Sequence, residues 1–192
     1  RIRAYVRNGI VVRQGETYDY QTYGDLYGNK ASINWNPRQC AKGYTFHRVI
    51  YGPYRLRHPI VRRGWKAWAD AGFPELTPER KQQYKFDARG DDEFVQIAWD
   101  DVLPLIAKAL VAITTRYNGE AGKQRLLAQG YQPEMVDEMG GAGTRTIKMR
   151  GGMGLLGVMG KYGMYRLNNS LALLDAKTRN VDHTQARAGR NW

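Results

Sequence analysis

The clearest pattern of apolar and polar positions lies in the middle of the chain. Residues 94–98 alternate between apolar and polar side chains, as a half-buried β-strand does, and Asp100 is then expected to cap a helix. Apolar residues next recur at helical spacing, at Val102, Leu105, Ile106, Ala109, Leu110 and Ile113. The pattern predicts a helix from residue 101 to about residue 117 with one buried stripe, and Pro104 is tolerated in its first turn.

The start of the chain predicts a β-hairpin. Residues 1–6 and 10–14 are the two expected strands, because Asn8 and Gly9 between them supply the positive φ angles that a tight turn requires. Residues 15–35 are rich in tyrosine, glycine and asparagine and have no clean period. They predict a loop.

Short elements are expected between the hairpin and the central strand. A helix over residues 43–51 would end at Gly52 and carry an apolar face made of Phe46, Val49 and Ile50. Residues 58–65 are expected to be extended. Thr77 and Pro78 predict a helix start, with Thr77 as the N-cap and Pro78 at the first position, where its missing N–H costs nothing.

Several further elements follow from local pattern. Trp65, Trp68 and Phe73 are expected to pack together as an aromatic patch. Helices are predicted over residues 122–128, 133–139 and 165–175. The basic, polar tail from residue 176 to residue 190 is expected at the surface.

The composition is that of a globular protein, and the net charge suggests a second hypothesis about its function. Of the 192 residues, 42% are hydrophobic and 25% are charged, which argues against wholesale disorder. The net charge of +12 would attract phosphate, and arginines interleave with tyrosines over residues 51–57, so a basic nucleic-acid-binding protein is one hypothesis. No helix-turn-helix, zinc or RNA-recognition signature supports it, and no apolar run reaches the length of about 18 residues that a membrane span needs.

A glycine-rich stretch over residues 140–163 is a candidate binding region. Backbone this poor in side chains either packs closely on other backbone or lets a phosphate-bearing cofactor approach, and the pattern matches neither a P-loop nor a dinucleotide fingerprint. Both explanations stay open. If a cofactor binds here, the candidate cofactor-binding residues are Arg145, Lys148, Arg150, Gly151 and Gly152.

The only cysteine, Cys40, stands in the motif Asn-Pro-Arg-Gln-Cys-Ala-Lys-Gly of residues 36–43. A lone cysteine is most often a small apolar side chain. Its surroundings, however, resemble a known family: a hairpin, a loop, this motif and then Tyr-Gly-Pro-Tyr-Arg-Leu-Arg-His-Pro over residues 51–59 are similar to the N-terminal region of the molybdenum bis-pterin oxidoreductases. Residues 94–101 resemble the strand of that family that ends in Ser-Trp-Asp-Glu, here with Ala98 and Asp101 substituted.

The resemblance to this dimethyl sulfoxide reductase superfamily implies two cofactors, a 4Fe-4S cluster and molybdenum bis-molybdopterin guanine dinucleotide. Cys40 matches one cluster ligand, and Lys42 matches the basic residue between the cluster and the nearer pterin, where an ammonium group assists electron transfer. Gln39 departs from the usual glycine. Because one thiolate cannot hold a cluster that needs four protein ligands, the chain is expected to be part of a longer polypeptide, not active alone.

The resemblance also implies a mixed fold, α+β or α/β. A small β-rich iron–sulfur region is expected over residues 1–60, a surface insertion over residues 61–93, and the start of an α/β molybdopterin-binding domain, incomplete at its C-terminus, over residues 94–192. The molybdenum-binding aspartate of the nitrite- and nitrate-handling relatives is expected beyond this chain. Neither Asp175 nor Asp182 is assigned that role.

The implied function is that of a catalytic subunit most similar to nitrate reductases and nitrite oxidoreductases. The reaction would be oxygen-atom transfer coupled to two-electron transfer, with nitrite and nitrate interconversion first and water-dependent hydroxylation of a hydrocarbon or steroid second. The expected partners are an iron–sulfur beta subunit, a haem or membrane-anchor subunit and the rest of the polypeptide. The expected location is periplasmic or membrane-associated.

Overall fold

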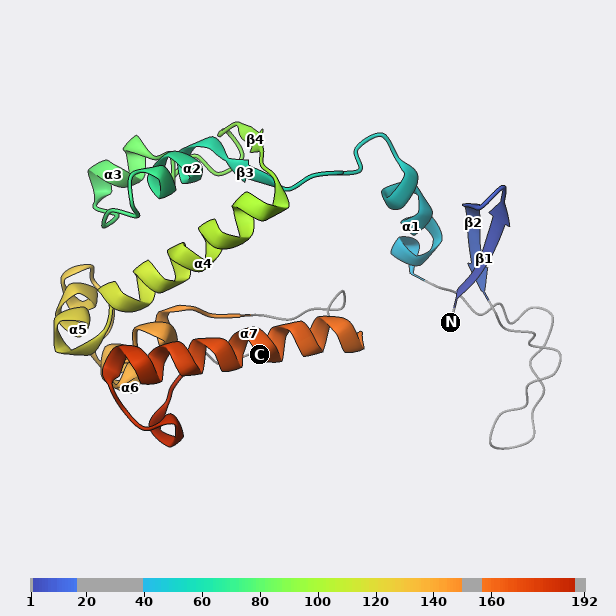
Figure 1. The fold of residues 1–192 in the computed structure, drawn as a ribbon. Coiled ribbons are helices and arrows are strands. Elements are labelled where there is room, and N and C mark those ends of the chain that lie inside the picture. Colours follow the sequence, from blue (N-terminus) through green and yellow to red (C-terminus); the bar gives the residue numbers. More distant parts are fainter. Residues whose placement is uncertain (1, 17–39, 150–156, 189–192) are drawn as a thin grey trace. The chain divides into compact units, whose positions relative to one another are not determined.

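The computed structural model describes residues 2–16, 40–149 and 157–188 of the chain. It divides the chain into two compact units, Arg1–Arg57 and His58–Trp192 (Figure 1). The predicted mixture of helices and strands is confirmed, and both sheets within the described ranges are two-stranded and antiparallel. The finer predicted division at residues 60 and 93 stays a prediction.

The first unit consists of a hairpin and one helix. Strands β1 (Ile2–Arg7) and β2 (Ile10–Glu16) pair antiparallel around Asn8 and Gly9, whose φ angles are 50° and 78°, so the predicted hairpin is confirmed. Helix α1 (Ala41–Tyr51) ends at Gly52, as predicted. The predicted loop over residues 15–35 lies almost wholly outside the described residues.

The second unit begins with a small sheet and a helix that the sequence did not indicate. Strand β3 (Ile60–Arg62) pairs antiparallel with β4 (Phe94–Gln96), and α2 (Arg63–Asp70) follows β3 directly. The predicted extended stretch over residues 58–65 is therefore confirmed at Ile60–Arg62 and wrong from Arg63 on. The reason is a remote carboxylate: Asp92 Oδ2 accepts a hydrogen bond of 3.0 Å from Gly64 N, in the first turn of α2, where no local side chain caps the helix.

Asp92 is buried and stabilises the junction between β3 and α2. Its side chain is fully buried, and Arg62 Nε lies 3.3 Å from Oδ2, close enough for an ion pair but without the direction of a hydrogen bond. Removing the carboxylate leaves the Gly64 N–H without its acceptor. The half-buried Arg62 loses its counter-charge and keeps the hydrogen bond from Nη2 to Lys85 O.

We therefore expect Asp92→Ala to lower the free energy of unfolding by about 3 kcal/mol, because it breaks a buried pair by deleting one partner. Urea denaturation of the full chain measures the change. Asp91→Ala is the matched control, since its side chain is exposed next door. An equal loss of unfolding free energy in Asp92→Ala and Asp91→Ala would contradict the role assigned to Asp92.

An aromatic core lies beside α2. Trp68 packs edge-on against Phe73 and Phe86, with ring centroids 5.1 Å and 5.4 Å apart, and Trp65 tilts against Trp68 at 6.1 Å. The predicted aromatic packing is thus confirmed. Trp68, Ala69 and Phe73, which all belong to the predicted surface insertion, form this buried cluster with Ala109.

Two helix starts differ in how well sequence predicted them. Helix α3 (Pro78–Gln83) begins as expected, with Thr77 Oγ1 accepting a hydrogen bond of 3.4 Å from Arg80 N. Helix α4 (Trp99–Arg116) begins two residues earlier than expected, at an N-cap formed by Ala98. The prediction that Asp100 caps the helix is wrong; Asp100 lies in the first turn, where its charge still favours the helix N-terminus, and Pro104 falls in the second turn.

The remaining elements complete the second unit (Figure 1). They are α5 (Gly119–Ala128), α6 (Pro133–Met139), the 3-10 turn η1 (Gly143–Thr146), α7 (Val158–Arg179) and the 3-10 turn η3 (His183–Gln185). Helix α6 matches its prediction, whereas α5 and α7 are longer than predicted. Both α4 and α7 contact η1. Within the described parts of the chain, no helix is long and apolar enough to cross a membrane.

Candidate functional site

Cys40 is the N-cap residue of α1 and has an exposed, free thiol. Its carbonyl accepts a hydrogen bond of 2.9 Å from Gly43 N, but its side chain makes no capping hydrogen bond. Lys42 lies in the first turn of α1, is exposed, and forms no ion pair with any described residue. The helix therefore places a thiol and an ammonium group two residues apart at its positive end.

This environment fits a metal-bound thiolate but supplies only one ligand. The unpaired N–H groups of a helix N-terminus stabilise a nearby negative charge, and thiolate is the form of cysteine that binds metals. Among the residues that the structure describes, no group of three or more His, Cys, Asp or Glu side chains is arranged to hold a metal ion. The described residues therefore offer Cys40 as a single candidate ligand, whereas a 4Fe-4S cluster needs about four protein ligands.

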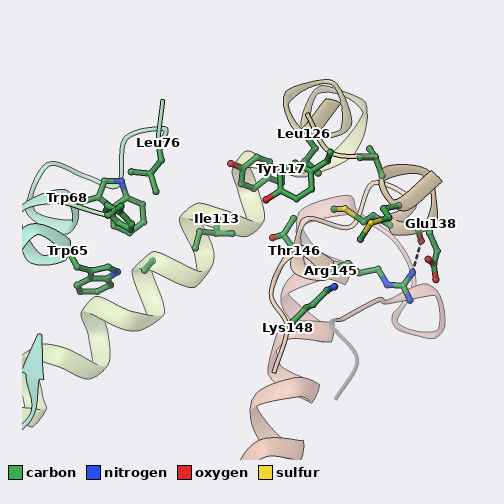
Figure 2. Close-up of a pocket in the computed structure, with 16 residues that line it drawn as sticks. Trp65, Trp68, Leu76, Ile113, Tyr117, Leu126, Glu138, Arg145, Thr146 and Lys148 are labelled. Carbon is green, nitrogen blue, oxygen red and sulfur yellow. Dashed lines mark hydrogen bonds between the residues drawn. The ribbon is translucent and has the colours of Figure 1, made fainter. Parts of the chain in front are cut away.

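A second candidate site is a cleft of about 900 Å³ in the second unit. Figure 2 shows Trp65, Trp68 and Leu76 along one part of its wall, Ile113 and Tyr117 of α4 between, and Arg145, Thr146 and Lys148 along another. The volume is within the range of small-molecule sites. Sequence reasoning missed this cleft, since its lining comes from segments up to about 80 residues apart.

Arg145 and Lys148 bring positive charge to this cleft. Arg145 Nη1 donates a hydrogen bond of 2.6 Å to the carbonyl oxygen of Glu138, as the dashed line in Figure 2 marks. Neither cation forms an ion pair with a described carboxylate, so both retain charge for an external anion. The other predicted cofactor-binding residues, Arg150, Gly151 and Gly152, lie outside the described residues.

Backbone packing explains the first glycines of the glycine-rich stretch. A Cβ atom at Gly143 would collide with the backbone carbonyl of Thr114, and Gly141 O accepts a hydrogen bond of 2.8 Å from Gly119 N. Gly141 also has a φ of 74°, which favours glycine. For these two positions, close approach of backbone to backbone accounts for the residue type without a cofactor.

A buried carboxylate near the end of α7 was not predicted. Asp175 is fully buried and accepts two hydrogen bonds from Arg179, of 2.9 Å and 2.6 Å, and a third of 2.7 Å from Arg187 N. The hydrogen bond with Asp175 raises the pKa of Arg179, although partial burial opposes this shift. Asp175 is thus occupied by a structural network and is not free to bind a metal.

The same network anchors the C-terminal segment. Arg179 Nη2 donates to Gln185 O at 2.8 Å, and Thr144 Oγ1 of η1 donates to Arg187 O at 2.6 Å. Residues 185–187 are therefore tied to both α7 and η1. Gln185 and Arg187 are nevertheless exposed, so the predicted surface location is confirmed for these two residues. The spacing of Asp175 and Arg179, four residues apart on a helix, was the available signal.

Comparison with known proteins shows to which protein family the chain belongs. A family model described as molybdopterin oxidoreductase matches residues 55–172, which is more than half of the chain. The chain therefore belongs to the molybdopterin oxidoreductase family. The predicted resemblance to this family is confirmed, and the matched residues include 94–101 but not the motif around Cys40.

The chain is also similar to individual curated proteins. The chain is 29% identical to the nitrate reductase alpha chain of Bacillus subtilis over 77% of its length, and 28% identical to the respiratory nitrate reductase 1 alpha chain of Escherichia coli over 78%. It is 26% identical to the perchlorate reductase subunit alpha of Dechloromonas aromatica over 56%. The chain spans only 12% of the length of both nitrate reductase chains.

Proposed function

We propose that this chain is part of the catalytic subunit of a molybdenum oxidoreductase that transfers an oxygen atom in a reaction coupled to two-electron transfer. The family match over residues 55–172 carries this proposal. Relatives named for the reduction of nitrate, perchlorate and trimethylamine N-oxide support oxygen-atom removal as the shared chemistry. Nitrite and nitrate interconversion is our first choice, because the nitrate reductase alpha chains align with more of the chain than the other named relatives do.

Cys40 and Lys42 are assigned to a 4Fe-4S cluster in this proposal. The cluster, when bound, supplies one-electron transfer. The exposed thiol of Cys40 would provide one ligand, and the helix N-terminus would stabilise its thiolate form. The ammonium group of Lys42, two residues on, would stabilise the additional negative charge of the reduced cluster.

Arg145 and Lys148 are assigned to the molybdopterin guanine dinucleotide, together with Arg150, Gly151 and Gly152. Arginine and lysine without carboxylate partners suit the phosphates of such a cofactor, and the cleft beside them is large enough for part of it. The bound cofactor supplies the oxygen-atom transfer itself. The protein's part is to hold the phosphates and to exclude water from the apolar portion of the cleft.

The proposal includes partners and a location. An iron–sulfur beta subunit would exchange electrons with the cluster, and a haem or membrane-anchor subunit is expected beyond it. A periplasmic or membrane-associated complex follows from these partners. The nitrate reductase alpha chains among the relatives support the multi-subunit arrangement, since their names designate one chain of several.

Metal analysis of the protein purified as it occurs in its source, combined with visible absorption, tests the proposal. We expect iron and molybdenum in stoichiometric amounts and a broad absorption band that bleaches on reduction. Absence of both metals, together with nucleic-acid binding that weakens steeply with salt, would reject the enzyme in favour of the nucleic-acid hypothesis. Nitrite and nitrate assays of the metal-loaded enzyme then test the choice of substrate.

Replacing Lys42 with methionine should slow electron transfer while the cofactors remain bound. Loss of one positive charge near the cluster destabilises its reduced form by roughly 1 kcal/mol, equivalent to a fall of about 40 mV in midpoint potential. Redox titration followed by electron paramagnetic resonance measures the fall. Lys42→Arg keeps the charge and should keep the potential; identical potentials in all three proteins would remove Lys42 from the electron path.

A further inference from the structure

Arg145 lies on a turn that is too short to fix its own orientation. The 3-10 turn η1 has four residues, Gly143–Thr146. Its backbone hydrogen bonds join Arg145 N to Ala142 O at 2.9 Å and Ile147 N to Thr144 O at 3.0 Å. The hydrogen bonds of a 3-10 turn are poorly aligned, so contacts with the rest of the second unit must hold η1 in place. These contacts come from α4, α6 and α7.

Thr144 and Arg145 leave η1 on different sides. The side chain of Thr144 is fully buried and does not line the cleft, whereas Arg145, Thr146 and Lys148 line it (Figure 2). Successive residues of a 3-10 turn are about 120° apart around its axis, because three residues make one turn. An anchor on Thr144 therefore sets the direction in which the next side chain, Arg145, leaves the turn.

The main chain of Arg187 is the anchor of Thr144. Thr144 Oγ1 donates a hydrogen bond of 2.6 Å to Arg187 O, and Arg187 N donates one of 2.7 Å to Asp175 Oδ2. Asp175 is itself fixed, since Arg179 donates to both of its carboxylate oxygens. Two hydrogen bonds and one residue of main chain thus join a buried carboxylate on α7 to the turn that carries Arg145.

The side chain of Arg187 reaches the same region. A Cβ atom at Gly140, the C-cap of α6, would collide with Arg187 Nη1, so the guanidinium group lies against the end of that helix. Arg145 Nη1 donates its hydrogen bond of 2.6 Å to Glu138 O, which also belongs to α6. Arg187 therefore borders both the turn that carries Arg145 and the helix that the Arg145 side chain contacts.

We infer that Asp175 is a positioning residue for the cations of the cleft. Its carboxylate holds the main chain of Arg187, and Arg187 holds Thr144, so that Arg145 and Lys148 face the phosphates of the cofactor. The inference deepens the proposed function and rests on it, because that function supplies the phosphate-binding role of these two cations. Asp175 itself does not line the cleft.

Thr144 is the first link to test, because deleting Asp175 would also break a buried ion pair and destabilise the fold. Thr144→Val keeps the shape of the side chain but removes the donor, whereas Thr144→Ser keeps the donor. In hydrogen exchange of the full chain, Thr144→Val should speed exchange at Arg145 N and Ile147 N about fivefold, equivalent to the loss of about one hydrogen bond. Thr144→Ser should leave both amides slow. Ala109 N in the buried part of α4 is the control and should keep the wild-type rate.

Isothermal titration calorimetry of the full chain with inorganic pyrophosphate tests whether the anchor affects the cleft. Thr144→Val should weaken pyrophosphate binding about fivefold, and Thr144→Ser should bind like the wild type. Arg145→Gln with Lys148→Gln is the reference variant, and it should lose binding because it removes both charges directly. A purely structural role of Thr144 in holding residues 185–187 would leave the affinity for pyrophosphate unchanged.

Two substitutions of Arg187 isolate its link to Asp175. Arg187→Ala and Arg187→Pro both remove the guanidinium group, but only proline also removes the N–H that donates to Asp175. The ion pair of Asp175 with Arg179 stays intact in both. Ala186, with φ of −62° and ψ of 141°, has an extended conformation that is compatible with a following proline. Relative to Arg187→Ala, Arg187→Pro should speed exchange at Arg145 N and weaken pyrophosphate binding about fivefold.

The inference and the proposed function fail in different ways. Slow exchange at Arg145 N in Thr144→Val, or equal exchange and affinity in Arg187→Pro and Arg187→Ala, would overturn the inference. Exchange at Ala109 that speeds up as much as exchange at Arg145 would do the same, since the whole unit would then be destabilised. An unchanged affinity in Thr144→Val, while the reference variant loses binding, would also overturn it. If the reference variant binds pyrophosphate like the wild type, the phosphate-binding role in the proposed function fails, whatever the exchange rates show.

Discussion

Replacing Asp175 with alanine is expected to lower the free energy of unfolding by about 3–5 kcal/mol, because it breaks a buried ion pair by removing one partner. The side chain of Asp175 is fully buried and that of Arg179 is only 15% exposed. Without the carboxylate, Arg179 keeps a largely buried charge, and Arg187 N loses its acceptor at 2.7 Å. Arg187 N would then carry an unmet desolvation cost, and Arg179 would keep only its hydrogen bond to Gln185 O, without a counter-charge.

Urea denaturation of the full chain, followed by tryptophan fluorescence, measures this loss. A matched control exists on α2, where Lys66 and Asp70 form the same kind of pair four residues apart, with Nζ and Oδ2 separated by 2.7 Å. Both of those side chains are substantially exposed, so Asp70→Ala should cost less than about 1 kcal/mol. Similar losses in Asp175→Ala and Asp70→Ala would show that burial does not set the importance of the α7 pair.

The loss should also have a local signature. Residues 185–187 are held to α7 and η1 through Asp175, Arg179 and Thr144. Asp175→Ala should therefore speed amide hydrogen exchange at Arg187 before the rest of the second unit unfolds. Thr144→Ser keeps the hydroxyl that donates to Arg187 O and should leave this exchange slow.

Elements that depend on neighbouring residues were predictable from the sequence. The hairpin follows from Asn8 and Gly9, and the start of α3 follows from Thr77 and Pro78. Helix α6 ends at Gly140, whose φ of 59° is the left-handed conformation that glycine favours at a helix end. In each case a few adjacent residues determine the backbone angles.

Elements that depend on distant residues were not predictable in this way. The start of α2 needs Asp92, which lies 28 residues after Gly64. The path of residues 185–187 needs Thr144, which lies 43 residues before Arg187. Asp100 shows the opposite error, since it is a good capping residue but stands two residues after the true N-cap, Ala98. At these positions, contacts between residues far apart in the sequence outweigh the local preferences of the sequence.

The candidate sites also differ in whether adjacent or distant residues form them. The motif around Cys40 lies in one short segment, so sequence alone was enough to single out Cys40 and Lys42. The cleft beside Arg145 could not be predicted, because Trp65, Tyr117 and Lys148 meet there only after α2, α4 and η1 have packed. The sequence singled out Arg145 and Lys148, and separately the aromatic residues Trp65 and Trp68, but it did not show that they line one cleft.

Replacing Cys40 with serine is expected to abolish the iron–sulfur cluster of the intact enzyme. A 4Fe-4S cluster is held by about four protein ligands, so loss of one thiolate should reduce iron well below the about four atoms per protein that the wild type would hold. Visible absorption and the electron paramagnetic resonance signal of the reduced cluster should fall in parallel. Electron transfer to an artificial acceptor would then stop at the cofactor.

Serine is the informative replacement because of where Cys40 lies. It is the N-cap of α1, and its side chain makes no capping hydrogen bond, whereas serine is among the preferred N-cap residues. Cys40→Ser should therefore keep or slightly strengthen α1, so a loss of iron cannot be ascribed to unfolding of the helix. Thr45→Ala on the exposed side of the same helix should leave iron unchanged. Full iron content in Cys40→Ser would show that this thiol is not a cluster ligand, and the assignment of Lys42 to the electron path would then lose its basis.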